Sequence, residues 1–236
     1  MIGSIIFYLL SLLTIIAANY AILAQVNFGV IASCISLSTP MNCLLSYVCF
    51  KEKLTLKMMM GTSVVFLGIV WVAFVKAKPI VSDVLVDEEM RGWYRSISIG
   101  VAIIIGVLNS VRTCHAKYAN LRHKYSPRDF NTDQGLLCGM FCLIASIIYY
   151  YRGTPSYTWY NLMVNFSASF MRMLCAFVSL NCMVKGLAGP TSALIQSNTV
   201  IQIGMNSLFL GLIPSLSQLC GSILTLSGVA LLIFYR

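Results

Sequence analysis

Long apolar stretches alternate with short polar gaps along this chain of 236 residues. Residues 1–50 and residues 186–235 contain no Asp, Glu, Lys or Arg. About 20 apolar residues cross a bilayer once as a helix, so each stretch is long enough for two crossings. The pattern predicts eight membrane-spanning helices, at residues 3–25, 27–50, 57–76, 95–113, 134–151, 160–184, 187–210 and 214–235. The period-two alternation of a membrane barrel is absent, so the expected fold class is all-α, a multi-pass transmembrane helical bundle.

The composition excludes several functional classes. Hydrophobic residues make up 58% of the chain and charged residues 10%, whereas soluble domains typically carry about a quarter charged residues. The net charge of +9 is spread over the gaps between apolar runs, so we expect no nucleic-acid partner. The nine cysteines form no metal-ligand pattern, and the common enzyme motifs are absent. The sequence therefore predicts no enzyme, no cofactor and no metal site.

Lys and Arg are divided unequally between alternating gaps, which predicts the orientation in the membrane. One set of gaps contains ten of them: Lys51, Lys53, Lys57, Arg112, Lys117, Arg122, Lys124, Arg128, Lys185 and Arg236. The other set contains five: Lys76, Lys78, Arg91, Arg95 and Arg152. By the positive-inside rule the first side is cytosolic, so both termini are expected in the cytosol of an endomembrane or plasma membrane.

Two of the gaps are longer than the others. Residues 77–94 contain four acidic residues and predict a solvated external or lumenal loop. Residues 114–133 are basic and predict a cytosolic loop, which either only sets the orientation or also binds an anionic lipid or partner.

The chain contains an internal repeat. A shift of 160 residues places the second and third predicted helices over the last two, and aligns the pairs Gly29 and Gly189, Gly61 and Gly221, and Gly68 and Gly228. Five crossings separate the two copies, and an odd number gives them opposite orientations. Inverted repeats are typical of secondary transporters, which bind their substrate between the repeats near the bilayer midplane.

Several residues of the first copy occur in a known arrangement. Pro40 lies mid-helix, Glu52 and Leu54 form the following turn, and Gly61 and Gly68 lie in the next helix. This arrangement resembles the repeat of the drug/metabolite transporter superfamily, of the EamA-like and nucleotide-sugar-transporter-like kind. The second copy retains the glycines and Gly189-Pro190, but Pro214-Ser215-Leu216 replaces the acidic turn.

Members of that superfamily typically have ten helices, five per repeat, which implies a division of this chain. Residues 1–76 would be the last three helices of the first repeat, residues 77–94 the loop, and residues 95–236 the complete second repeat. The first two helices of the family are then expected upstream of Met1. A homodimer is the alternative way to complete the bundle.

Polar residues inside membrane helices are costly, so they are candidate binding residues. Asn198, Gln202 and Asn206 share one helix face, and the repeat places them over Ser38, Asn42 and Ser46. The two stripes are expected to line a common substrate cavity. The alternative is that they form hydrogen bonds between helices and serve only packing.

Arg172 is the strongest single candidate for a substrate ligand. It lies near the centre of the predicted helix 160–184, on one face with Asn165, and no Asp or Glu lies inside any predicted span. A guanidinium facing a wet cavity could hold a phosphate or carboxylate with two parallel hydrogen bonds. The alternative is an arginine that is satisfied by backbone carbonyls or stacked on an aromatic ring.

These features predict a secondary transporter that moves a small organic metabolite, bearing an anionic group, by alternating access. Its expected partners are the small-molecule substrate and the lipid bilayer. A multi-pass scaffold without transport activity, or a truncated carrier fragment, stays open as the alternative.

Overall fold

The computed structural model describes residues 2–24, 26–52, 55–74, 88–152, 158–185, 191, 195, 198–210 and 214–234. These residues form helices and short connections, without a strand among them. The helices are α1 (Ile2–Leu23), α2 (Phe28–Ile35), α3 (Ser38–Phe50), α4 (Leu56–Phe74), α5 (Glu88–His123), α6 (Pro127–Tyr151), α7 (Trp159–Lys185), α9 (Asn198–Leu210) and α10 (Leu216–Phe234). When α2 and α3 are counted as one broken segment, the described part of the chain contains eight helical segments, as predicted.

Five helical stretches are long and apolar enough to cross a membrane: Gly3–Leu23, Val30–Phe50, Glu89–His123, Pro127–Ile148 and Trp159–Lys185. Large apolar side chains are exposed on the outside of these stretches, for example Ile15, Leu143 and Phe166. Water would penalise such a surface, whereas lipid tails solvate it. The chain is therefore an all-helical, multi-pass membrane protein, which confirms the predicted fold class.

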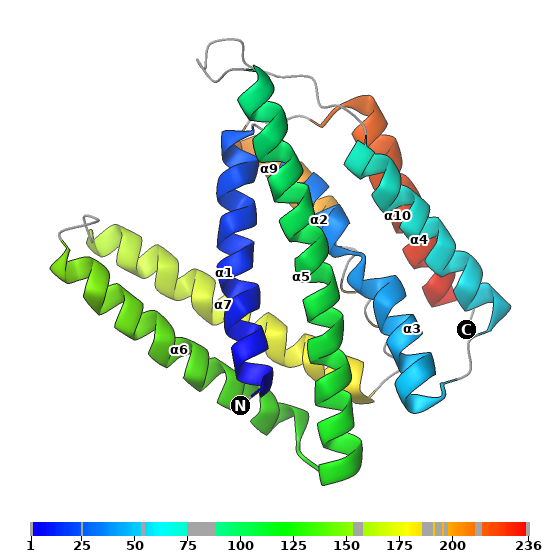
Figure 1. The fold of residues 1–236 in the computed structure, drawn as a ribbon, viewed down its shortest axis with the longest axis horizontal. Helices are drawn as coiled ribbons and strands as arrows, with labels where there is room; N and C mark the ends of the chain where they lie inside the picture. Colours follow the sequence, from blue (N-terminus) through cyan, green and yellow to red (C-terminus); the bar gives the residue numbers. More distant parts are fainter. Residues whose placement is uncertain are drawn as a thin grey trace.

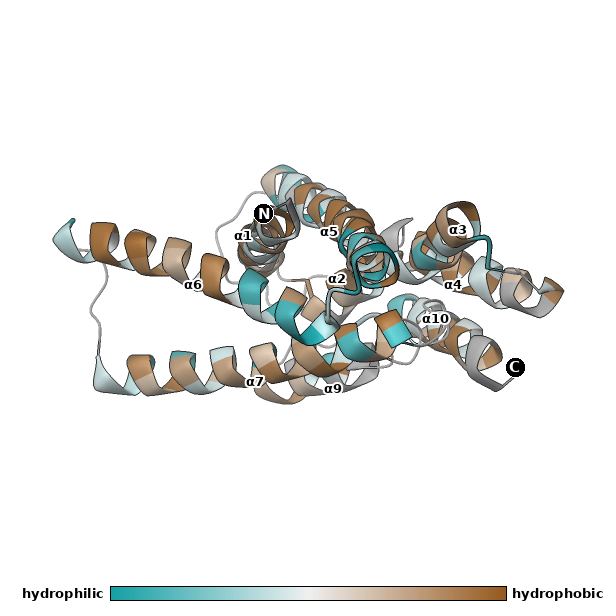
Figure 2. Cartoon of the chain, turned by 90° about the horizontal axis from the view of Figure 1, so that it is seen from below, coloured by the Kyte–Doolittle hydropathy of each residue, from teal (hydrophilic) through white to brown (hydrophobic). Residues whose placement is uncertain are grey.

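The helices form a central group with a pair of helices on each side (Figure 1). The central group contains α1, α5, α2 and α3, and its core includes Ala17, Val30, Ile31 and Ala102. Helices α4 and α10 pack against each other on one side, and α6 and α7 extend away on the other. Figure 2 shows that hydrophilic residues gather where α5 ends and α6 begins, while the long helices are mainly apolar.

The connection between α5 and α6 corrects the sequence prediction. Helix α5 has 36 residues, running from Glu88 to His123, although the apolar pattern predicts a helix only at 95–113. The expected loop at 114–133 is reduced to residues 124–126, and part of the expected loop at 77–94 is also helical. Charged residues with good helix propensity continue a helix beyond the apolar run, so hydropathy alone underestimates its length.

A local sequence signal explains where α6 begins. Ser126 is the N-cap, its side chain accepts a hydrogen bond from the backbone N–H of Arg128 at 3.2 Å, and Pro127 occupies the first turn. Proline is favoured there because its missing N–H would have no helical partner. Helix α10 begins in a similar way, with reciprocal hydrogen bonds between Ser215 and Gln218.

Helices α9 and α10 lie at the positions that a shift of 160 residues assigns to α3 and α4. The helix ends at Phe74, Asn198, Leu210 and Phe234 adjoin residues outside the described part of the chain. Most of the residues that the shift places over α2 lie outside the described part of the chain.

The contact between α4 and α10 is reciprocal under the same shift. A Cβ at Gly68 would contact the Thr225 side chain and lie 2.9 Å from the Gly221 carbonyl. A Cβ at Gly228 would contact Val65, the counterpart of Thr225, and lie 2.9 Å from the Gly61 carbonyl. Glycine therefore lets the two antiparallel backbones approach closely, as small residues do in membrane helix pairs.

Candidate membrane-embedded polar site

The second membrane segment is interrupted inside the apolar stretch Val30–Phe50. Helix α2 ends at Ile35 and α3 begins at Ser38. Pro40 has no N–H to donate to the carbonyl of Ser36, and the N–H of Thr39 donates to that carbonyl instead, at 2.9 Å. The shorter i to i+3 bonds tighten the chain locally, so the segment breaks into two helices.

Helix α5 holds this break in place. A Cβ at Gly106 would lie 3.0 Å from the Ile35 carbonyl, so glycine permits the close approach of α5. One turn further along, the Ser110 hydroxyl donates to the Ser38 carbonyl at 3.0 Å. In lipid, an interrupted backbone needs such internal partners because no water is available.

The predicted polar residues of α3 are buried at this break. Ser38, Asn42 and Ser46 are 0%, 2% and 5% exposed. Of the second predicted stripe, Gln202 is half-buried, and its buried Oε1 has no hydrogen-bond partner among the described residues. The side chains of Asn198 and Asn206 lie outside the described part of the structure.

Among the described residues, the contacts between the regions of the two stripes include α2. Helix α3 packs against α5 and α4, whereas α9 packs against α2. The Asn27 amide, just before α2, donates to the Ile203 carbonyl at 3.5 Å and to the Ser207 hydroxyl at 3.4 Å, both in α9. Ser33 in α2 lies 3.5 Å from Ser222 in α10, measured between hydroxyl oxygens. Asn27 and Ser33 therefore contribute polar contacts from the α2 region to α9 and α10. The sequence pattern does not mark them as candidates because they precede the polar stripe of α3.

Arg172 lies apart from this polar region. Its side chain is exposed, and Nη2 donates to the Ser11 hydroxyl of α1 at 3.2 Å. Asn165 is also exposed, and its amide donates to the Asn161 carbonyl one turn earlier in α7. The sequence predicts that Arg172 faces Asn42 and Gln202. In the structure its described hydrogen-bond partner is instead Ser11 of α1.

A second arginine is the buried one. Arg112 is 8% exposed, Nε donates to Gln134 Oε1 at 2.8 Å, and Nη2 donates to Asn131 Oδ1 at 3.1 Å. The sequence pattern placed Arg112 at the cytosolic end of a span and gave it only an orienting role. The signal that could have found it is the pair Asn131 and Gln134, which share one face of α6.

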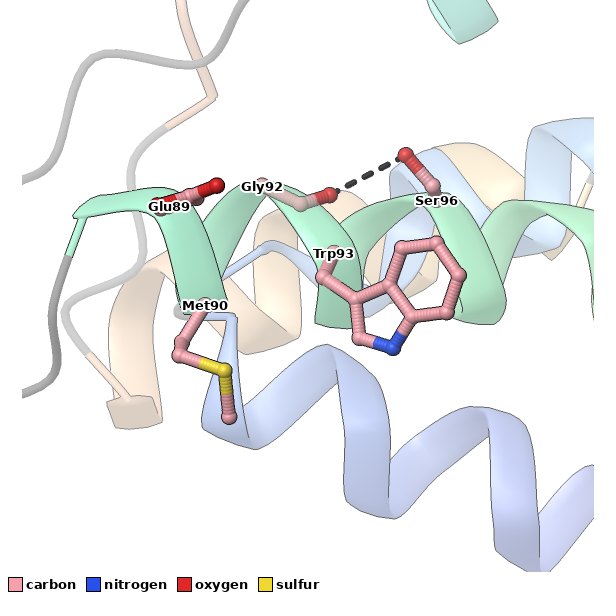
Figure 3. A pocket seen from close by; sticks show the side chains of 5 residues that line it. All are labelled: Glu89, Met90, Gly92, Trp93 and Ser96. Atoms are coloured by element: carbon pink, nitrogen blue, oxygen red, sulfur yellow. Dashed lines mark hydrogen bonds between the residues drawn. The ribbon is translucent and has the colours of Figure 1, made fainter.

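A pocket at the start of α5 does not have the features of a binding site. It has a volume of about 650 Å³ and lies against the first turns of α5, where it is lined by Glu89, Met90, Gly92, Trp93 and Ser96 (Figure 3). All five residues belong to one helix, and the Ser96 hydroxyl donates to the Gly92 carbonyl of the same helix. A binding pocket needs polar groups that converge from several elements.

Comparison with known proteins does not identify a family. No protein-family model matches the chain, and a search of curated proteins finds no match. The resemblance to the drug/metabolite transporter superfamily remains a prediction, based on Pro40, Glu52, Leu54 and the repeated glycines.

The turn between α5 and α6 contains a group with a shifted titration. The Tyr125 hydroxyl donates to Asp133, and this hydrogen bond raises the pKa of Tyr125 to about 12. The pKa of Tyr125 in the unfolded chain is about 10, so the hydrogen bond stabilises the fold fully below pH 10. The stabilisation disappears as the pH rises through about 12.

We expect wild type to be more stable than Tyr125→Phe at neutral pH and to lose this advantage as the pH rises from about 10 to about 12. Thermal unfolding of both proteins measures the difference, and a constant difference would contradict the assignment.

Proposed function

We propose that this chain is a secondary transporter that moves a small organic metabolite by alternating access between two inverted repeats. The observation that carries the proposal is the interrupted segment α2–α3, whose break lies among the buried polar side chains of Ser38 and Asn42. Broken helices at membrane depth are tolerated where the backbone is buried in protein or lines a cavity, and transporters bind substrates and ions at such breaks.

The relation between α3–α4 and α9–α10 supports the two-repeat part of the proposal. Reciprocal glycine contacts between α4 and α10 are expected of two copies of one unit that pack in opposite orientations. An all-helical carrier of this kind, with Pro40 and Glu52 in the first copy, agrees with membership of the drug/metabolite transporter superfamily.

The orientation follows from one ion pair and the charge distribution. Lys117 in α5 pairs with Glu52 at the end of α3, so the C-terminal ends of these helices lie on the same side. This is the side to which the ten Lys and Arg residues were assigned, and the positive-inside rule makes it cytosolic. Both termini are then cytosolic as well.

A flux measurement tests the transport function. The purified chain is reconstituted into liposomes, and uptake is measured for a mixture of isotopically labelled amino acids, sugar phosphates and nucleotide sugars. We expect uptake of at least one of these solutes. Loss of one neutral hydrogen bond costs about 0.5–1.5 kcal/mol, so Asn42→Ala should reduce that flux by about 2- to 12-fold per folded molecule. Ser63→Ala is the matched control, because Ser63 is exposed on α4 and its hydroxyl donates to the Met59 carbonyl of its own helix.

Thiol accessibility tests the mechanism independently of the solute. In a background without the nine native cysteines, Ser38→Cys should react with an impermeant maleimide from either side of the membrane, because alternating access opens the break to each side in turn. Val65→Cys, in the dry contact between α4 and α10, should stay unreactive. A folded protein without flux and without reactivity at position 38 would instead support the scaffold alternative.

A further inference from the structure

Arg112 is a buried cation whose partners are all neutral. Asn131 and Gln134 accept its Nη2–H and Nε–H, and the ring of Phe7 lies 4.5 Å from its Cζ. No carboxylate lies within ion-pair distance of it among the described residues. A buried charge without an opposite charge is costly, because neutral amides replace only part of its hydration.

Arg172 approaches the same face of α1 from another helix. Phe7 and Ser11 are one turn apart on α1, Phe7 lies against Arg112, and Ser11 accepts a hydrogen bond from Arg172. Arg112 and Arg172 therefore contact neighbouring positions on one face of α1, and the helices that carry them, α5 and α7, pack against each other. Arg172, like Arg112, has no ion-pair partner in the described part of the chain.

The side-chain amides next to Arg112 present N–H donors to a ligand. Their oxygens, on Asn131 and Gln134, already accept hydrogen bonds from Arg112. Gln134 is 1% exposed, and its Nε2 has no partner in the described structure. Gln134 also lines a pocket of about 320 Å³ together with Ser4 and Asp133. Neither arginine lines this pocket, and the Asp133 carboxylate would repel an anion there, so the pocket is not the anion site.

We propose that Arg112 and Arg172 together bind an oxyanion, a phosphoryl or carboxylate group, between α1, α5, α6 and α7. The anion neutralises two cations that otherwise repel each other in a region of low dielectric, and it accepts the unused N–H groups. Arginine suits this role because its planar fork donates two parallel hydrogen bonds to such a group. That the anion belongs to a transported solute rests on the function proposed above. A lipid headgroup would offer the same chemistry.

Thermal unfolding of the purified full chain in mild detergent tests the site, with inorganic phosphate as the probe and chloride of equal ionic strength as the reference. A ligand that binds only the folded state raises the melting temperature with its concentration. We expect phosphate to stabilise wild type, and Arg172→Gln to weaken phosphate binding by about 10- to 150-fold, the loss of one charge-assisted hydrogen bond. Arg172→Lys should weaken it less, because it keeps the charge but loses the fork.

Two further variants keep the test decisive. Arg128→Gln removes one charge from an exposed position of α6 and should bind phosphate like wild type. Arg112→Gln should abolish binding, and if it fails to fold, Arg172→Gln decides alone because its side chain is exposed. If Arg172→Gln and Arg128→Gln weaken phosphate binding equally, the weakening comes from the loss of net charge alone, and the proposed site is wrong.

Nanodiscs distinguish the two sources of the anion. Stabilisation by phosphatidic acid over phosphatidylcholine, with no response to phosphate, would identify a lipid headgroup as the ligand. Absence of both responses would overturn the proposal, even if the chain transports solutes. Phosphate binding in a chain without flux would instead leave the site in place and overturn only the transport function.

Discussion

Replacement of Lys117 by methionine should lower the free energy of unfolding by about 3 kcal/mol, near the lower end of the range for breaking a buried ion pair. Lys117 and Glu52 form an ion pair, and their side chains are 8% and 22% exposed. Methionine fills most of the space but leaves the Glu52 carboxylate without its cation. The partial exposure of Glu52 allows some hydration, which is why we expect a value at the low end. Unfolding of the purified protein, followed by near-UV circular dichroism, measures the loss.

The double variant Lys117→Met, Glu52→Gln is the control for this prediction. It removes both charges, so no unpaired carboxylate remains and most of the lost stability should return. If the double variant is as unstable as Lys117→Met alone, the effect comes from packing around Lys117, which also lies 5.5 Å from the Phe50 ring centroid.

Gly68→Val and Gly228→Val should each destabilise the contact between α4 and α10 by about 1–3 kcal/mol, as overpacking of a tight contact does. At Gly68 a Cβ would lie 2.6 Å from the Thr225 backbone nitrogen, and at Gly228 a Cβ would lie 2.6 Å from the Val65 backbone nitrogen. Backbone atoms cannot move aside as a flexible side chain can, so the helices must separate. The yield of folded protein and its melting temperature in detergent should fall together.

The reciprocity of this contact makes the prediction sharper. Because Gly68 and Gly228 occupy equivalent positions in the two copies, we expect losses of similar size. Gly100→Ala in α5 is the control, since a Cβ there meets nothing within 4 Å. Alanine is the better helix former by about 1 kcal/mol, so this variant should be neutral or slightly more stable. Clearly unequal losses at Gly68 and Gly228 would contradict the equivalence of the two contacts.

Some residues of the candidate polar site can be recognised from the local sequence, and others only from the tertiary contacts. Ser38, Asn42 and Ser46 could be selected from the sequence because polar residues are rare in apolar spans and these three share a helix face. Their neighbours could not be selected in this way. Ser110 reaches the Ser38 carbonyl, and Asn27 reaches α9, only because tertiary packing places α5 and α9 beside the broken segment.

Arg112 and Arg172 illustrate the same limit for charged residues. Arg172 attracts notice because it interrupts an apolar run, whereas Arg112 lies at the end of such a run and looks like an ordinary interfacial charge. Local sequence does not reveal which of the two is buried. Burial depends on Asn131 and Gln134, which belong to another helix.

The sequence by itself determined the apolar character of the helical segments and their number in the described part of the chain. These features are local, because hydrophobic length decides whether a segment crosses the bilayer. The apolar pattern predicts an unbroken helix at 27–50 and a helix start at 134, so it missed the break before Pro40 and the start of α6 after the Ser126 cap. Only the tertiary structure decided which faces meet, and so which polar groups find partners. Membrane helices are apolar around most of their circumference, so hydrophobic periodicity does not mark the packed face. The faces that meet are determined by specific contacts between helices, including the close approaches at Gly68, Gly106 and Gly228 and the ion pair of Lys117 with Glu52.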